Sequence, residues 1–215
     1  MQRNYKQKML EKKSFLEYNL RKNTRIFFMN KERILAFTDA VVAIIMTIMV
    51  LEIKAPEEAT LEALASQLPY YCAFLLSSVS IYFSWLHHHN LFNTVKKVSL
   101  GVFWANGLWL LGMALIPMAT SWLSKNVNAF LPEFFYFIVY CVWSVAYYVL
   151  DNRIFAYQNR IGKTMQREGI IRHFWIDLAL FLIGIILIPI IPISGVILTI
   201  IQMSTWTIVP YIVKA

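Results

Sequence analysis

The polar residues at the start of a long apolar segment are those in this sequence whose types and spacing suggest chemistry. Arg33 and Asp39 lie six residues apart, with Phe37 and Thr38 between them, and an uncharged run follows directly. An ionised aspartate one turn into a membrane helix is costly unless other polar groups contact it. The pattern therefore predicts either a hydrogen-bonded cluster or a proton relay at this depth.

Polar residues in two other apolar segments are expected to supply the partners. His88 lies at the end of the second apolar segment, and Asn106 lies about two turns into the third. The order of the segments places both at the depth of Thr38 and Asp39, so we expect a cluster of these four side chains. Arg33 is expected to pair with Asp39 or with a helix C-terminus. A structural lock is favoured over a proton relay through Asp39 and His88.

The three consecutive histidines at 87–89 are a weak metal signal. On a helix their side chains point about 100° apart, so one ion cannot take all three. We expect no tightly bound metal. Asp177, expected in the first turn of the fifth helix, is interpreted as favouring that helix N-terminus.

The composition indicates an integral membrane protein. Hydrophobic residues make up 59% of the 215-residue chain. Charged residues make up 15%, well below the roughly 25% of soluble domains. Six apolar segments predict an all-α membrane protein with six transmembrane helices per subunit. They are 34–53, 68–87, 100–123, 132–150, 174–188 and 196–213. We therefore expect a basic cytoplasmic N-terminal segment, 1–33, and a transmembrane domain, 34–213.

The distribution of positive charge sets the expected orientation. With six spans both termini share one side, and eighteen Lys and Arg residues fall there, whereas only Lys54 and Lys125 fall on the other side. Positive residues accumulate on the cytoplasmic side of membrane proteins. Both termini are therefore expected in the cytoplasm. The same asymmetry explains the net charge of +8 without a nucleic-acid partner.

The first helix carries an apolar stripe at helical spacing. Phe37, Val41, Ile44, Ile48 and Leu51 share one face, and Thr47 lies at its edge. The stripe is either an ordinary packing face or the lining of a narrow pore at an oligomer axis, where apolar rings gate by dewetting. Periodicity alone does not choose between these alternatives.

Several signatures are missing from the sequence. It contains neither a Thr-Val-Gly-Tyr-Gly potassium filter nor a phosphate-binding Gly-x-x-x-x-Gly-Lys loop. No converging nucleophile, base and metal ligands are evident, and the segments between helices are too short for an enzymatic domain. An enzyme is therefore not expected.

The residues resemble the transmembrane protein 175 family of potassium channels. The match begins with Arg33-x-x-x-Phe37-Thr38-Asp39, which is similar to the family's Arg-x-x-x-Phe-Ser-Asp signature with the hydroxyl kept at Thr38. Trp85-x-x-His88 in the second helix and Asn106 in the third extend the resemblance.

The resemblance implies a homotetramer in the lipid bilayer of a plasma membrane, with the first helix lining a central pore. It implies a constriction at Ile44, Ile48 and Leu51, selectivity at Thr47, and potassium passing transiently near Ile44 and Thr47 without a cofactor. The signature residues Arg33, Phe37, Thr38, Asp39, Trp85, His88 and Asn106 would brace the first helix rather than touch ions. The alternatives are a proton-permeable channel or a proton-coupled transporter using Asp39 and His88.

Overall fold

The computed structural model describes residues 28–95, 97–160 and 168–212. Most of the expected N-terminal segment, 1–33, lies outside these ranges. The described chain is almost wholly helical. Its helices are α2 (Lys31–Leu51), α3 (Leu61–Ser66), α4 (Leu68–Asn93), α5 (Leu100–Ala114), α6 (Ile116–Lys125), α7 (Phe130–Arg160), α8 (Glu168–Leu187) and α9 (Ser194–Ile212).

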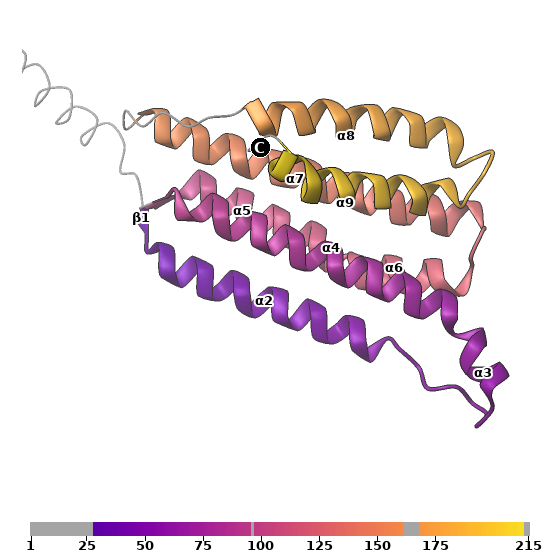
Figure 1. Ribbon diagram of the computed structural model, residues 1–215. Coiled ribbons are helices and arrows are strands. Elements are labelled where there is room, and N and C mark those ends of the chain that lie inside the picture. Colours follow the sequence, from indigo (N-terminus) through magenta and orange to yellow (C-terminus); the bar gives the residue numbers. More distant parts are fainter. Residues whose placement is uncertain (1–27, 96, 161–167, 213–215) are drawn as a thin grey trace, which may run out of the picture.

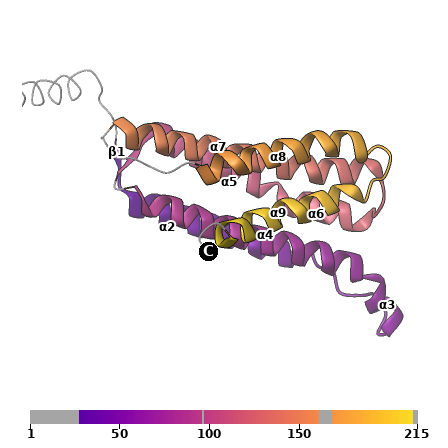
Figure 2. The ribbon, with the colours of Figure 1, turned by 45° about the horizontal axis from the view of Figure 1, so that its top comes forward.

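The long helices run roughly side by side in layers (Figure 1). Helix α2 packs against α4, α5 and α6, and α8 packs against α7 and α9 on the other side of the bundle. After a turn of the view, α2 still lies at an edge and α8 still lies away from it (Figure 2). One end of the bundle holds the first strand, and the opposite end holds α3. These are called the β1 end and the α3 end below.

A two-stranded antiparallel sheet closes the β1 end. Strand β1 (Phe28–Met29) pairs with β2 (Val98–Ser99), so the chain entering α2 is joined to the connection between α4 and α5. Asn30 then caps α2, because its side-chain oxygen accepts a hydrogen bond from the Glu32 backbone N–H at 2.9 Å. Helix α2 therefore starts three residues before the predicted span.

Four stretches are long and apolar enough to cross a bilayer: Lys31–Leu51, Leu100–Lys125, Phe130–Arg160 and Gly169–Leu187. The protein is a multi-pass membrane protein on this basis. Helix α4 is long enough but less apolar, since it carries several serines, of which Ser77 and Ser80 are buried inside the bundle. Of α9, residues 194–206 are apolar.

The predicted helix ending at residue 150 continues as α7 to Arg160. Its extension is held by the connection between α4 and α5. Ile154 and Gln158 are buried there, and the Gln158 side-chain N–H donates to the Thr94 carbonyl at 2.6 Å. Residues 151–160, which lie beyond the predicted span, are therefore helical.

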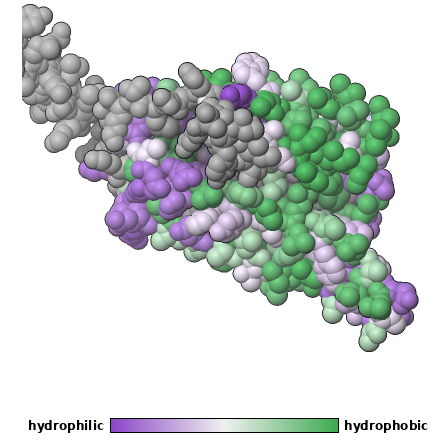
Figure 3. All heavy atoms as spheres, viewed as in Figure 1, coloured by the Kyte–Doolittle hydropathy of each residue, from purple (hydrophilic) through white to green (hydrophobic). Residues whose placement is uncertain are grey.

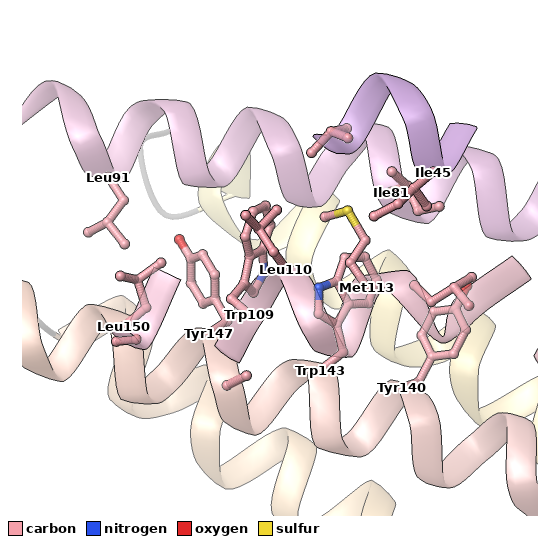
Figure 4. Close-up of a cluster of buried hydrophobic side chains, with 14 of the residues drawn as sticks. Ile45, Ile81, Leu91, Trp109, Leu110, Met113, Tyr140, Trp143, Tyr147 and Leu150 are labelled. Carbon is pink, nitrogen blue, oxygen red and sulfur yellow. The ribbon is translucent and has the colours of Figure 1, made fainter. Parts of the chain in front are cut away.

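The core lies mainly between α5 and α7 (Figure 4). Trp109 and Met113 of α5 are fully buried, and Trp143 and Tyr147 of α7 lie close to them. Gly112 permits this close approach, because a Cβ at that position would come within 3.1 Å of the Trp143 Cα atom. Outside the core, hydrophobic side chains cover much of the visible surface, and hydrophilic ones gather at the β1 end and near α3 (Figure 3).

Candidate pore helix and its polar brace

One face of helix α2 packs against the other helices of its own subunit. The buried residues follow helical spacing and are at most 8% exposed. They are Ile34, Thr38, Val42, Ile45 and Met49. Because α2 contacts only α4, α5 and α6 closely, the rest of its circumference has no partner within the described part of the subunit.

The apolar stripe predicted from the sequence lies on the uncovered side. Phe37 is 59%, Ile44 58%, Ile48 42% and Leu51 76% exposed. Val41, at the edge of the stripe, is half-buried. The stripe is therefore largely uncovered within its own subunit, where only Val41 packs against the core. Its role as a packing face or as a pore lining stays a prediction.

Thr47 also lies on the uncovered side. Its hydroxyl donates to the Ala43 carbonyl of the preceding turn at 2.8 Å. This bond uses the hydroxyl proton and leaves the oxygen lone pairs free to accept, since a hydroxyl is one donor and two acceptors. The Thr47 oxygen can therefore accept a hydrogen bond or coordinate a cation at the exposed face of α2.

A buried hydrogen-bonded chain joins α2 to α4 and α5. The Asn106 side-chain N–H donates to the Thr38 hydroxyl oxygen at 2.9 Å, and Asn106 Oδ1 lies 2.7 Å from His88 Nε2. All three side chains are at most 2% exposed. Because the amide oxygen accepts, His88 carries its proton on Nε2 in this bond. We call Thr38, Asn106 and His88 the polar brace.

Aromatic rings fix the histidine of the brace. The His88 ring stacks on Phe92 with centroids 4.4 Å apart and on Trp109 with centroids 4.5 Å apart. Trp109 is itself fully buried, so the brace connects α2 to the core between α5 and α7.

Asp39 belongs to a separate contact, not to the brace. It is exposed, and its Oδ1 atom accepts a hydrogen bond from the Trp85 indole N–H at 2.8 Å. The expected four-residue cluster therefore divides into two. One residue later on a helix is about 100° further round, so Thr38 points into the bundle while Asp39 points along its side.

Arg33 does not pair with Asp39 in the structure. The two lie six residues apart on one helix, which leaves their side chains about 120° apart. Arg33 is exposed, and no ion pair involving it is recorded in residues 28–95, 97–160 or 168–212. Its role in the signature stays a prediction, as does that of the exposed Phe37.

The three adjacent histidines have three different surroundings. His87 Nε2 lies 3.1 Å from the Trp206 carbonyl oxygen, His88 contacts Asn106, and His89 is exposed. They diverge as helical geometry requires.

Two features of the structure were not predicted from the sequence: a contact of Glu52 and the position of Asp177 in its helix. Glu52 accepts a hydrogen bond from the Ser121 hydroxyl at 2.9 Å, so it ties the end of α2 to α6. Asp177 lies in the middle of α8 and not in its first turn, because that helix begins at Glu168. A buried charge in the middle of a membrane helix was the available signal, and it was assigned to the wrong helix position.

Comparison with known proteins identifies the family. The model of the family described as endosomal/lysosomal potassium channel TMEM175 matches residues 33–117. A potassium channel of Chryseobacterium sp. (strain P1-3) is 37% identical over 159 residues, which cover 73% of this chain and 82% of that protein. A potassium channel of Chamaesiphon minutus is 39% identical over 99 residues, covering 43% of this chain and 49% of that protein.

The fold is also found in a solved structure. The crystal structure of a lysosomal potassium-selective channel TMEM175 homolog from Chamaesiphon minutus aligns with a TM-score of 0.68 and 26% sequence identity. The alignment covers 82% of this chain and 96% of that one. The chain therefore belongs to the TMEM175 family, which consists of ion channels and not of enzymes.

Proposed function

We propose that the chain is one subunit of a homotetrameric potassium-selective leak channel, with α2 lining a central pore. One observation carries the proposal: the apolar stripe of α2 is exposed in the single subunit, on the side that its own helices leave uncovered. Two relatives, which match over 73% and 43% of this chain, are named potassium channels.

In a cyclic oligomer the apolar stripe of α2 would line a pore. Cyclic assembly brings the same surface of each subunit to one axis. Four copies of α2 would then present rings of Ile44, Ile48 and Leu51 to the axis. An apolar ring excludes bulk water, and an ion that passes must lose part of its hydration shell. Potassium loses water more easily than sodium because it is larger, so the constriction favours potassium.

Thr47 compensates part of the dehydration cost. Its hydroxyl oxygen keeps free lone pairs because its proton is already donated to Ala43. A ring of four such oxygens, one helical turn from Ile44, would coordinate a partly dehydrated ion. Potassium thus passes transiently near Ile44 and Thr47, and no cofactor is involved.

The six-span architecture and the orientation belong to the same proposal. Helices α2, α4, α5 with α6, α7, α8 and α9 form six spans over residues 34–213, with the β1 end and both termini in the cytoplasm and residues 1–33 as a basic segment at the plasma membrane. The exposed Glu57 and Glu58 at the α3 end would then attract cations to the outer mouth.

The polar brace holds α2 at the rotation that aims the stripe at the axis. Thr38 is bonded on the buried face, which is opposite Thr47 and well away from Ile44 on the helix. The brace therefore acts on ions only through the position of α2. A transporter that moves protons between Asp39 and His88 is less well supported, because Asp39 bonds Trp85 and His88 bonds Asn106.

The proposal is tested by potassium flux from proteoliposomes for Ile44→Asn against Ile44→Leu. Asparagine hydrates the constriction, and lowering the barrier by about 1.4 kcal/mol raises flux roughly tenfold. Ile44→Leu keeps the ring apolar and should retain both rate and potassium preference. Equal fluxes for wild type, Ile44→Asn and Ile44→Leu would refute a constriction at this residue.

Thr47→Ala should weaken the preference for potassium over sodium. Losing the hydroxyl ligand is expected to lower the permeability ratio about two- to fivefold, or roughly 0.4–1 kcal/mol, as measured by reversal potentials in a planar bilayer. Thr47→Ser keeps the oxygen and serves as the matched control. If Thr47→Ala and Thr47→Ser give the wild-type ratio alike, the selectivity role assigned to Thr47 is wrong.

Asn106→Leu should destabilise the protein. It leaves the buried Thr38 hydroxyl and the buried His88 ring N–H without partners, at about 1–3 kcal/mol each. The midpoint of thermal unfolding in detergent should fall relative to wild type, whereas Asn90→Leu, an exposed position on α4, should leave it nearly unchanged. A wild-type unfolding midpoint would contradict the role of the brace in holding α2.

A further inference from the structure

A cavity of about 70 Å³ lies between α4, α7 and α9. No described residue of α2 lines it, so it is separate from the helix that we assign to the pore. Of the three helices around it, only α4 falls within residues 33–117, which match the family model. We call it the inner cavity.

The inner cavity is closed on one side and open on the other. Tyr140, Trp143 and Tyr147 of α7 are at most 8% exposed and form its closed wall (Figure 4). Ser84 of α4 and Gln202 of α9 also line the cavity, and both are only half-buried. The cavity therefore opens at the surface of the subunit between α4 and α9, where a small molecule can enter.

The lining favours an uncharged occupant. None of the described residues that line the cavity is a lysine, arginine, aspartate or glutamate. His87 lines it, and its Nε2 atom lies 3.1 Å from the Trp206 carbonyl oxygen. A charged ligand would lose its hydration there without an opposite charge to replace it, which is costly inside a protein.

Two polar groups of the lining have hydrogen-bonding capacity to spare. The Tyr140 hydroxyl is buried and has no partner among the described residues. Gln202 donates from its side-chain nitrogen to the Ser144 hydroxyl oxygen at 3.2 Å, and its Oε1 atom has no hydrogen bond within the described ranges. Tyr140 can donate and Gln202 can accept, a pair that one hydroxyl group of a ligand satisfies, because a hydroxyl both accepts and donates.

The rest of the lining suits a short alkyl chain. Phe83, Met203 and Trp206 line the cavity together with the polar groups. Apolar walls gain more from contact with an alkyl chain than from contact with water. A cavity of about 150 Å³ holds benzene, so a volume of this size holds a molecule of about three or four heavy atoms.

We propose that the inner cavity is a binding site for a small uncharged alcohol. The hydroxyl group of the ligand lies between Tyr140 and Gln202, and its alkyl chain packs on Phe83 and Trp206. A buried hydroxyl without a partner costs free energy that a phenylalanine would avoid, and the ligand supplies the partner that Tyr140 lacks. The proposal does not depend on the pore or on the tetramer, since the whole site belongs to one subunit.

The test asks whether 1-propanol, a molecule of this size, protects a thiol placed in the lining. Cys72 and Cys141 are first replaced by serine. Ser84→Cys then puts a thiol in the cavity, and Ser204→Cys puts one on α9 outside the lining, at a residue that is also half-buried. The full chain in detergent reacts with methyl methanethiosulfonate, a small uncharged reagent.

Saturating 1-propanol should slow the modification of Ser84→Cys at least fivefold and leave that of Ser204→Cys unchanged. Propionate, which is similar in size but charged, should protect neither. Tyr140→Phe and, independently, Gln202→Leu should each raise the half-protecting concentration of 1-propanol at least threefold. Tyr82→Phe, at an exposed tyrosine on α4 outside the lining, should not change it, and the thermal unfolding midpoint shows that each variant is folded.

Each outcome decides for or against the site. Selective protection of Ser84→Cys that weakens in Tyr140→Phe and Gln202→Leu supports it. Equal slowing of both thiols, which an effect of 1-propanol on the detergent would cause, overturns it. So does the absence of protection, as for a cavity that holds only water, or a half-protecting concentration that neither change shifts. No ion flux is measured, so the result stands apart from the channel proposal.

Discussion

The rest of the structure depends on how α2 is rotated against its subunit. Thr38 is its one polar residue that is fully buried, and a hydroxyl in that position needs a partner because no water is available inside a membrane protein. Asn106 supplies the partner, and His88, stacked between Phe92 and Trp109, holds Asn106 in turn. A rotation of α2 by one residue would break these hydrogen bonds and would bury Asp39 instead of Thr38. In the proposed channel, the brace would determine which side of α2 lines the pore.

The bilayer explains where the polar residues lie. Lipid offers no hydrogen bonds, so several serines and tyrosines of α4 and α7 point inward and bond one another, as Ser77 and Tyr136 do. The apolar surface then faces outward, the reverse of a soluble bundle. Two kinds of polar interior result. One is the hydrogen-bonded brace beside α2. The other lies around a cavity between α4, α7 and α9, where several buried polar groups have no partner among the described residues.

The sequence predicted much of this arrangement, and its failures have physical causes. Four of the six predicted spans and the meeting of Thr38, His88 and Asn106 follow from hydropathy and from counting helical turns. The separation of the brace from the Asp39–Trp85 contact could not be predicted, because depth in the membrane does not determine the direction in which neighbouring side chains point.

The extension of α7 to Arg160 was not predicted either, because its polar residues are typical of a connection between helices. In the structure Ile154 and Gln158 are buried against another segment. Asp177 was misplaced for a similar reason, since α8 begins earlier than its apolar run.

The most direct test of the account is whether water-soluble thiol reagents reach the exposed face of α2 and block potassium flux. Ile44→Cys and its neighbour Ile45→Cys are compared in a background in which Cys72 and Cys141 are replaced by serine. Ile44 is 58% exposed and Ile45 3% exposed, on different faces of one helix. The account predicts that the reagent stops potassium flux through Ile44→Cys and leaves Ile45→Cys unaffected. Potassium flux that persists through fully modified Ile44→Cys would contradict it, because the stripe would then face lipid or another helix instead of the pore.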